Sequence, residues 1–290
     1  MTHAPAHLDT AAVRRDFDRA STSYDEAAVL QRQVRELLLA RLDWIRLTPQ
    51  VIADLGCGTG HAARALAARW PAARVLAVDS APGMLREAAR LGGAAPGCEL
   101  LQADARSLPL PTASVDLIFS NLMLQWCDEP GTVFAECLRV LRPGGLLMFT
   151  TFGPGTLTEL REAWRAADDY AHVSAFVDLH ELGDELLRRD FADPVLDVER
   201  CSLTYADLRG LMRDLKAIGA QNATAARPRG LTGRRRLRAV EIAYEQYRRD
   251  GLLPASYEVV FGQAWAPSAG GGRRVDFADA RTGPHRFRLP

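Results

Sequence analysis

Three glycines at alternate positions form the chemically most informative pattern of the chain. An apolar run that ends in Asp54 is followed by Gly56, Gly58 and Gly60, and a helix-forming run begins at His61. This order predicts a strand, a tight turn and a helix, and the helix start offers unpaired N–H groups to a ligand carboxylate. The dinucleotide pattern G-x-G-x-x-G would need a glycine where His61 stands.

Two further acids end apolar runs downstream of the glycines. Asp79 ends the run 74–79, and Asp104 with Ala105 ends the run 99–105. An acid at the end of a second strand can accept hydrogen bonds from both ribose hydroxyls, so Asp79 is a candidate ribose ligand. Taken together, the three strand-end acids and the glycine spacing indicate a nucleotide-type site.

The spacing G-x-G-x-G after an acidic strand end resembles motif I of the class I S-adenosylmethionine (SAM) methyltransferases. The resemblance implies an α/β fold with a seven-stranded, mostly parallel sheet and helices on both faces. It implies SAM as cofactor, held by Asp54 and the three glycines. It also implies that Asp104 and the N–H of Ala105 recognise the adenine.

The remaining elements must position these residues. We expect a helix over 25–45, and strands over 51–55, 74–79, 99–105, 115–121 and 146–152, with a turn at 142–145. Beyond them we expect helices over 156–167 and 179–189, strand six over 194–203 and strand seven over 256–265.

Two helices, over 205–218 and 232–249, fall between strands six and seven and predict a helical lid at about 204–250. We therefore expect a methyltransferase domain over 1–266 and a mobile basic tail over 267–290.

The composition of the chain indicates the cellular compartment in which such a domain is expected. The 290 residues are 48% hydrophobic, and no run approaches the roughly 18 apolar residues of a membrane span. No secretory signal is visible. The five cysteines include no C-x-x-C pair, so we expect free thiols in the cytoplasm and no metal site.

The second half of the chain contains a series of distinctive segments, in this order: SNLMLQWCDEP (120–130), TFGPGTLTELR (151–161), HVSAFVDLHELGDEL (172–186), DPVLDVE (193–199), LTYADLRGLMRDLKAIGAQN (203–222), GLTGRRRL (230–237) and LPASYEVVFGQAW (253–265). Together these segments closely resemble the BioC family, the malonyl-[acyl-carrier protein] O-methyltransferases of biotin synthesis. The likeness covers about residues 10–266.

The resemblance implies methylation of the free carboxylate of malonyl-[acyl-carrier protein], which gives the methyl ester that starts pimeloyl synthesis. An arginine hydroxylase that assembles respiratory complex I shares many of the segments, and a non-catalytic SAM-binding scaffold is a third interpretation. The sequence leaves the oligomeric state and the choice between carrier-protein and coenzyme A thioesters open.

A carboxylate acceptor is already ionised at neutral pH, so the predicted reaction needs no general base. The site must instead hold a carboxylate in a dry pocket, and an arginine fork suits that task. Arg161, after strand five, is our candidate. Tyr24 could close over the methyl donor, and Asn121 follows strand four, where donor and acceptor meet. An ordinary helix arginine and a packing aromatic are the competing interpretations of Arg161 and Tyr24.

Three further residues are candidate substrate ligands. Gln125 and Trp126 follow strand four, with a wall or core position as the alternative for Trp126. His172 is assigned a binding role, with a structural role as the alternative, rather than a catalytic one, since the chemistry needs no base.

Charge is balanced over the whole chain but not along it. The last quarter, residues 227–290, holds 13 arginines, no lysine and 6 acids, a net charge of +7. Acyl-carrier protein is acidic, so these arginines could bind it; biased codon usage is the alternative. Nucleic acid is not expected, because no aromatic-interleaved basic platform accompanies them. The lid arginines concerned are Arg227, Arg229, Arg234, Arg235, Arg236 and Arg238.

Overall fold

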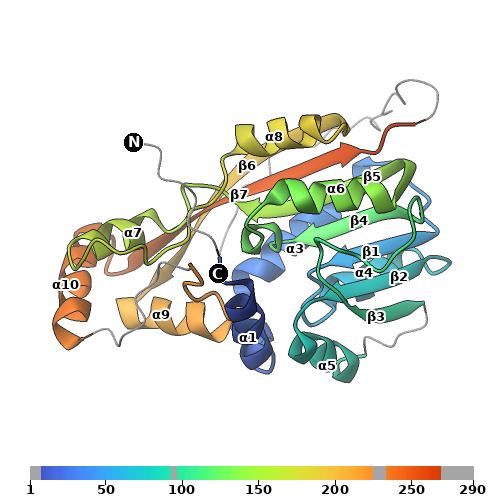
Figure 1. Cartoon of the computed structure of the whole chain (residues 1–290). Coiled ribbons are helices and arrows are strands. Elements are labelled where there is room, and N and C mark those ends of the chain that lie inside the picture. The colour runs from blue at the N-terminus through green and yellow to red at the C-terminus, as the bar shows by residue number, and fades with distance from the viewer. Residues whose placement is uncertain (1–7, 93–96, 225–232, 269–290) are drawn as a thin grey trace.

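The chain folds around a seven-stranded sheet with helices on both of its faces (Figure 1). The structure is a computed structural model that describes residues 8–92, 97–224 and 233–268. Its strands are β1 (Val51–Leu55), β2 (Arg74–Asp79), β3 (Cys98–Gln102), β4 (Val115–Asn121), β5 (Leu141–Phe152), β6 (Ala192–Tyr205) and β7 (Leu253–Trp265).

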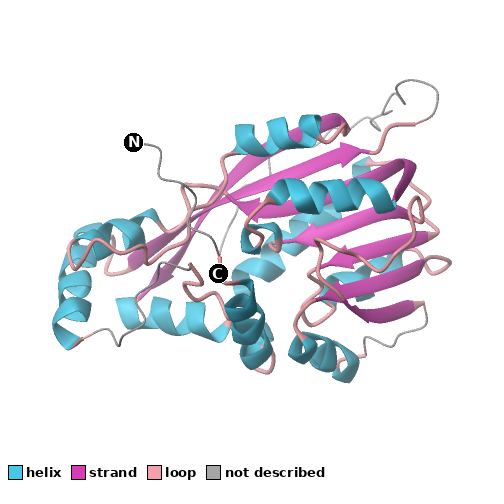
Figure 2. Ribbon diagram, viewed as in Figure 1, coloured by secondary structure: helices cyan, strands magenta, loops and turns pink. Residues whose placement is uncertain are grey.

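The order across the sheet is β3-β2-β1-β4-β5-β7-β6. Strands β1 to β5 pair in parallel, whereas β7 runs antiparallel to both of its neighbours, β5 and β6 (Figure 2). The central strands are covered on both faces, which explains why they consist of continuous apolar runs rather than alternating ones. The seven-stranded, mostly parallel sheet predicted from the sequence is confirmed.

Helices cover the sheet in two layers. They are α1 (Thr10–Ala20), α2 (Tyr24–Ala27), α3 (Val29–Arg41), α4 (His61–Arg69), α5 (Pro82–Arg90), α6 (Pro130–Val140), α7 (Thr158–Arg165), α8 (Leu179–Arg188), α9 (Leu208–Ala217) and α10 (Arg234–Tyr244), with short 3-10 turns at Leu42–Trp44, Leu124–Trp126 and Glu245–Tyr247. Leu38 of α3 and Leu66 of α4 pack in one core cluster, and Phe134 of α6 and Leu186 of α8 pack in the other.

The two lid helices, α9 and α10, do lie between β6 and β7 in chain order. Strands β6 and β7 pair as far as Tyr205 and Leu253, and Figure 1 shows α7, α9 and α10 gathered around that end of the hairpin. The loop that joins α9 to α10 includes residues outside the described ranges. The boundary at 266 and the tail from 267 stay predictions, since 269–290 also lie outside those ranges.

Several predicted boundaries were wrong. The helix expected over 25–45 is broken at Ala28, whose φ and ψ of −82° and 46° separate α2 from α3. The turn expected at 142–145 is absorbed into β5, where the pairing with β4 shifts register. Strand β3 ends at Gln102, because the chain turns directly after it: the N–H of Ser107 donates to the carbonyl of Asp104 at 3.0 Å.

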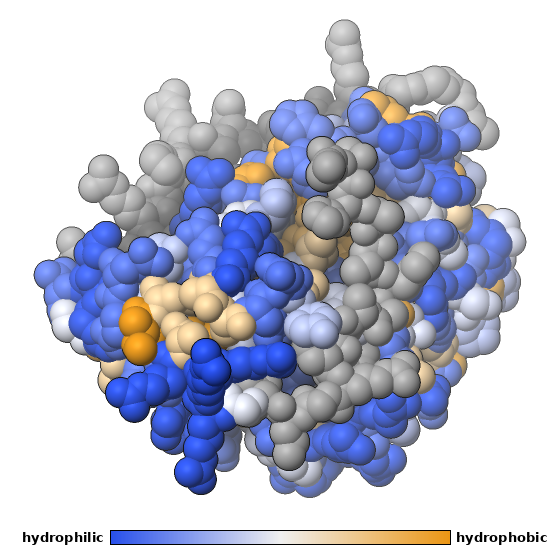
Figure 3. Space-filling model, turned by 60° about the vertical axis from the view of Figure 1, so that its left-hand side comes forward, coloured by the Kyte–Doolittle hydropathy of each residue, from blue (hydrophilic) through white to orange (hydrophobic). Residues whose placement is uncertain are grey.

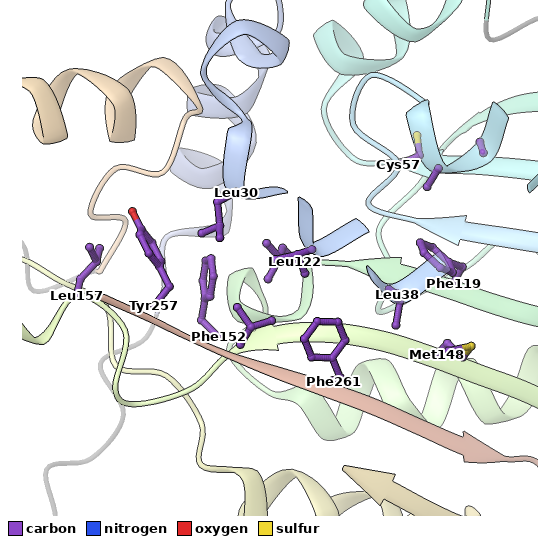
Figure 4. Packing of buried hydrophobic residues seen from close by; sticks show 14 of the residues in the cluster. Leu30, Leu38, Cys57, Phe119, Leu122, Met148, Phe152, Leu157, Tyr257 and Phe261 are labelled. Atoms are coloured by element: carbon purple, nitrogen blue, oxygen red, sulfur yellow. The ribbon is translucent and has the colours of Figure 1, made fainter. Parts of the chain in front are cut away.

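Strands β6 and β7 extend beyond their predicted ends because each supplies the other with a ladder partner. One core cluster runs from beneath the sheet to the lid. Figure 4 shows Phe152 between Leu122 on one side and Tyr257 on the other, with Leu157 beyond. No helix among the described residues has the length and apolar composition needed to cross a membrane.

Candidate active site

The glycine-rich turn has the backbone shape that its sequence requires. Gly56, Gly58 and Gly60 have φ values of 70°, 54° and 81°, in the left-handed region that favours glycine. The N–H of Gly56 donates to the carbonyl of Val78 at 2.8 Å. A Cβ on Gly56 would lie 2.4 Å from Cγ of Met123, so no larger residue fits there. The turn is therefore held tightly between β2 and the loop after β4.

Asp79, at the end of β2, ties this turn to the next helix. Its Oδ2 accepts a hydrogen bond from the N–H of Gly58 at 2.9 Å, and its Oδ1 accepts one from the N–H of Ala81 at 2.8 Å. Burial raises the pKa of the carboxyl, and these N–H groups oppose that rise. Each oxygen keeps a further lone pair, which is the acceptor pair that a ribose diol needs.

A cavity of about 540 Å³ opens at the carboxyl ends of the strands, where ligands bind in open α/β sheets. We call it the sheet-edge cavity; its lining includes Phe17, Tyr24, Gly56, Gly58, Asp79, Met84, Ala103, Asp104, Ala105, Arg106, Asn121, Leu122, Met123 and Trp126. Asp104 and Ala105 thus both line this cavity, and their role toward an adenine stays a prediction. The side chain of Arg106 lies on the Asp104 carboxylate, with Nη2–Oδ2 at 2.6 Å, and lowers its pKa.

A second cavity, of about 190 Å³, lies on the other side of the glycine turn. We call it the glycine-loop cavity; Tyr24, Gln31, Arg35, Asp54, Gly56, Gly58, His61 and Asn121 are part of its lining. Asp54 is 1% exposed, and its Oδ2 has no hydrogen-bond partner among the described residues. Burial raises the pKa of Asp54 to about 7.

Arg35 of α3 faces the same cavity, and burial lowers the pKa of its guanidinium. The sequence reasoning did not single it out, because an arginine on an amphipathic helix gives no signal of its own. A buried acid with a spare oxygen and a half-buried arginine form a pair that suits a zwitterion. In a free amino-acid end, the ammonium group could pair with the acid and the carboxylate group with the arginine.

The third cavity, of about 80 Å³, is lined mostly by apolar side chains and lies between the sheet and the lid. We call it the apolar cavity; its lining includes Phe17, Tyr24, Leu122, Gln125, Trp126, Phe152, Thr156, Leu157, His172, Ser174, Phe176, Leu215, Asn222 and Tyr257. The labelled residues in Figure 4 show how Leu122, Phe152 and Tyr257 build one of its walls.

Tyr24 lines all three cavities. It is partly buried, and desolvation raises the pKa of its hydroxyl, with the negative charges of Asp79 and then Asp25 adding to the rise. Phe17 of α1 lies beside it with ring centroids 6.4 Å apart, and Phe17 meets Trp126 edge-on at 5.2 Å. These three aromatic rings form the partition at which the sheet-edge cavity meets the apolar cavity.

The two amides that the sequence predicted are fixed in the walls. Asn121 donates through Nδ2 to the carbonyl of Gln31 at 3.1 Å and accepts from the hydroxyl of Thr150 at 3.0 Å. Gln125 donates to the carbonyl of Leu122 at 2.6 Å. Asn121 lines the two cavities beside the glycine turn, whereas Gln125 lines the apolar one.

His172 reaches the apolar cavity from the loop before α8. Its ring stacks on Trp164 of α7 with centroids 3.6 Å apart, and its Nε2 lies 2.7 Å from Oδ1 of Asp168. Burial raises the pKa of Asp168, but the hydrogen bonds from His172 and the N–H of Tyr170, together with the nearby charge of Arg236, lower the pKa below the usual range. Arg236 of α10 approaches the other oxygen at 3.6 Å. The contacts with Trp164 and Asp168 were not foreseen.

Arg161 lies behind the wall of the apolar cavity rather than on it. Its guanidinium donates to the carbonyls of Pro154 at 3.0 Å, Thr156 at 3.2 Å and Ser174 at 3.4 Å. Thr156 and Ser174 line the cavity. Burial lowers the pKa of Arg161, and no acid among the described residues lies within ion-pair distance of it. Arg161 is thus a half-buried cation without a matching carboxylate.

Comparison with known proteins shows which family this chain resembles. Residues 53–149 match the family model described as a methyltransferase domain. A malonyl-[acyl-carrier protein] O-methyltransferase of Methylovorus sp. is 53% identical over 99% of this chain and 98% of its own. Another, from Laribacter hongkongensis, is 50% identical over 95% of each chain.

Among solved structures, the YcgJ protein of Bacillus subtilis superposes with a TM-score of 0.56 at 14% identity, covering 82% of this chain and 100% of that one. That likeness supports the fold alone. The sequence-based predictions of a class I methyltransferase fold and of SAM as cofactor are confirmed. The chain belongs to the family of malonyl-[acyl-carrier protein] O-methyltransferases.

Proposed function

We propose that this protein transfers a methyl group from SAM to the free carboxylate of a malonyl group carried by acyl-carrier protein, the first step toward pimeloyl synthesis for biotin. Two relatives at 50% identity or more bear the name of that reaction. The structural observation that carries the proposal is the partition of Tyr24, Phe17 and Trp126. These three rings line both the sheet-edge cavity, which contains Asp79 and Asp104, and the apolar cavity.

The residues of the two cavities beside the glycine turn fit the cofactor. Asp79 would accept from the ribose hydroxyls, and Asp104 with Ala105 would face the adenine. The unpartnered oxygen of Asp54 would take the ammonium of the methionine end, and Arg35 its carboxylate. When bound, SAM supplies an electrophilic methyl group on a sulfonium.

The protein's part in the transfer is alignment and exclusion of water. The acceptor carboxylate needs no deprotonation, because its unperturbed pKa lies near 4, about that of Asp. Tyr24 and Trp126 would enclose the reacting atoms, while Asn121 and Gln125, each fixed by hydrogen bonds, hold the walls in place. His172 would contact the thioester arm from the opposite wall.

Arg161 would bind the malonyl carboxylate. A half-buried cation that already gives hydrogen bonds to neutral carbonyls gains most from an anionic partner, since the pair forms in a dry setting. Methylation removes the negative charge, so the ester loses this attraction and can leave. The free acid should therefore react, whereas a neutral acetyl thioester should not.

This assignment is tested by comparing Arg161→Ala with Arg165→Ala. Both residues belong to α7, but Arg165 is exposed. Arg161→Ala should lower kcat/KM for malonyl-carrier protein by about 2–4 kcal/mol in transition-state terms. SAM affinity should stay unchanged, and Arg165→Ala should behave as wild type. Equal turnover by both variants would move the role away from Arg161.

We propose that the carrier protein docks on the exposed face of α10. Arg234, Arg238 and Ile242 are spaced four residues apart and form one stripe, and Ile242 is 65% exposed. Figure 3 shows hydrophobic residues rimmed by hydrophilic ones on the side that carries α7 and α10. Arg235 lies beside the stripe, whereas Arg236 turns to Asp168. Arg227 and Arg229 lie outside the described residues.

Docking and chemistry can be separated with two substrates. Reversing Arg234, Arg235 and Arg238 to Glu should raise KM for malonyl-carrier protein and leave KM for a small malonyl thioester nearly unchanged. Higher salt should weaken the carrier reaction of wild type, because attraction between exposed charges fades over a Debye length of about 8 Å. The same effect on both substrates would contradict docking on α10. We also propose a cytoplasmic location, which the five free thiols support.

A further inference from the structure

The loop that follows β5 lies between two side chains of opposite charge. The carbonyl of Pro154 accepts a hydrogen bond from Nη1 of Arg161 at 3.0 Å. The N–H of Gly155 donates to Oε1 of Glu258, on β7, at 3.4 Å. Both groups belong to one peptide unit, in which C=O and N–H point in opposite directions. This peptide dipole therefore has a cation at its carbonyl end and an anion at its N–H end.

Glu258 fastens the loop through its backbone as well. Its carbonyl accepts from the N–H of Gly153 at 2.8 Å, and its N–H donates to the hydroxyl of Thr156 at 3.1 Å. The residue is 9% exposed. Added Cβ atoms on Gly153 and Gly155 would lie 2.4 Å and 2.7 Å from its carboxylate oxygens. The two glycines of the TFGPG segment thus make room for this carboxylate.

The remaining partner of the carboxylate faces solvent. Arg200 on β6 donates to Oε2 of Glu258 from Nε at 3.1 Å and from Nη2 at 3.0 Å, and its side chain is 80% exposed. An ion pair with so exposed an arginine contributes little to stability. Arg200 donates to the same carboxylate, and among the described residues it makes no hydrogen bond to the loop, so it offers a matched control.

We propose that Glu258 is a positioning residue that sets the orientation of the Pro154–Gly155 peptide and, through its carbonyl, holds Arg161 against the wall of the apolar cavity. Thr156, at the end of the same loop, lines that cavity. The proposal rests on the proposed function of Arg161 as the ligand of the malonyl carboxylate. It adds a residue of another strand, 97 positions away from Arg161 in the chain, to the acceptor site.

Two variants test it with the full-length protein, malonyl-carrier protein and SAM. Glu258→Gln keeps the shape but removes the charge, and Glu258→Asp keeps the charge but shortens the reach. Each should raise KM for malonyl-carrier protein roughly tenfold, the scale of one lost charge-assisted hydrogen bond. The kcat, the SAM Kd and the melting temperature should change little. Arg200→Ala should leave KM within about twofold of wild type.

The double variant shows whether the effect passes through Arg161. In an Arg161→Ala background, Glu258→Gln should raise KM by less than about twofold, because residues that act through one another are not additive. Additive effects would overturn the proposal, as would a wild-type KM in both single variants. An equal fall in SAM affinity and stability would overturn it too. If the wild-type protein did not methylate malonyl-carrier protein, the proposed function itself would be contradicted. Failure of the proposed function can therefore be distinguished from failure of the proposal for Glu258.

Discussion

Replacing Asp54 by asparagine should stabilise the cofactor-free protein at alkaline pH and weaken its binding of SAM. Asp54 is 1% exposed, and one of its oxygens has no partner among the described residues. Burial raises the pKa of the carboxyl to about 7; Asp79 adds to the rise, and Arg35 opposes it. The ionised carboxylate is therefore a costly buried charge until a cation pairs with it.

The size of this cost follows from the pKa. A rise from 3.8 to about 7 is about 3 units, or about 4 kcal/mol as an upper bound. Because the pKa of Asp54 is raised in the folded state, the contribution of its neutral carboxyl group to stability is fully present below about pH 4. That contribution is lost as the pH rises through about 7. Asparagine cannot ionise and avoids that loss. Relative to wild type, the variant should gain about 1–3 kcal/mol in the free energy of unfolding between pH 5 and pH 8.5.

Thermal unfolding at both pH values, with and without SAM, measures this directly. In the presence of SAM, wild type should be more stable than Asp54→Asn, because the variant loses the partner of the SAM ammonium group. Calorimetry should show that the variant binds SAM about 2–3 kcal/mol more weakly. Asp43→Asn, at an exposed acid, is the control and should show neither effect. A stability difference that does not depend on pH, or an unchanged SAM affinity in Asp54→Asn, would refute the reasoning.

Variants at three further residues probe the same cavities. Asp79→Ala should weaken SAM binding by about 1–3 kcal/mol, as unpaired polar groups in a site do, and calorimetry checks it. Arg35→Gln should raise the Kd for SAM and change the Kd for adenosine little, because only the methionine end would meet Arg35. Tyr24→Phe should keep most of the turnover, since the ring still fills the partition. Tyr24→Ala should lower kcat roughly tenfold or more, because water can then enter the site. Equal kcat values for the two variants would show that Tyr24 does not belong to the site.

The cofactor half of the site could be predicted because its determinants are local. Gly56, Gly58 and Gly60 need left-handed backbone, and Asp79 sits at the end of the neighbouring strand, so a few consecutive residues carry the signal. Parallel strands bring their carboxyl ends to one edge of the sheet. For the same reason the alternation of strands and helices was sufficient to predict the order of elements up to β5.

The acceptor half could not be predicted in detail, because its contacts join distant parts of the chain. The orientation of Arg161 depends on a loop clamped by Glu258, and His172 is held by Trp164 and Asp168 from the preceding helix and loop. No periodicity reports such side-chain contacts. The antiparallel position of β7 between β5 and β6 could not be predicted for the same reason. The sequence pattern of a last strand does not indicate where it inserts in the sheet or in which direction it runs.

Element ends were missed where tertiary pairing overrides local preference. The break at Ala28 turns α2 away from α3 and lets Tyr24 face all three cavities, although the residues from 25 to 45 read as one amphipathic helix. Strands β6 and β7 extend through residues that carry no strand signal, because each completes the other's ladder.

The most direct test of the account is the mass of the product. Purified protein is incubated with SAM and either malonyl-carrier protein or acetyl-carrier protein, and the carrier is weighed by intact mass spectrometry. The account predicts that malonyl-carrier protein gains one methyl group, which leaves together with the malonyl group when the thioester is cleaved, while acetyl-carrier protein gains none. Methylation of both carriers, or of neither, would contradict it.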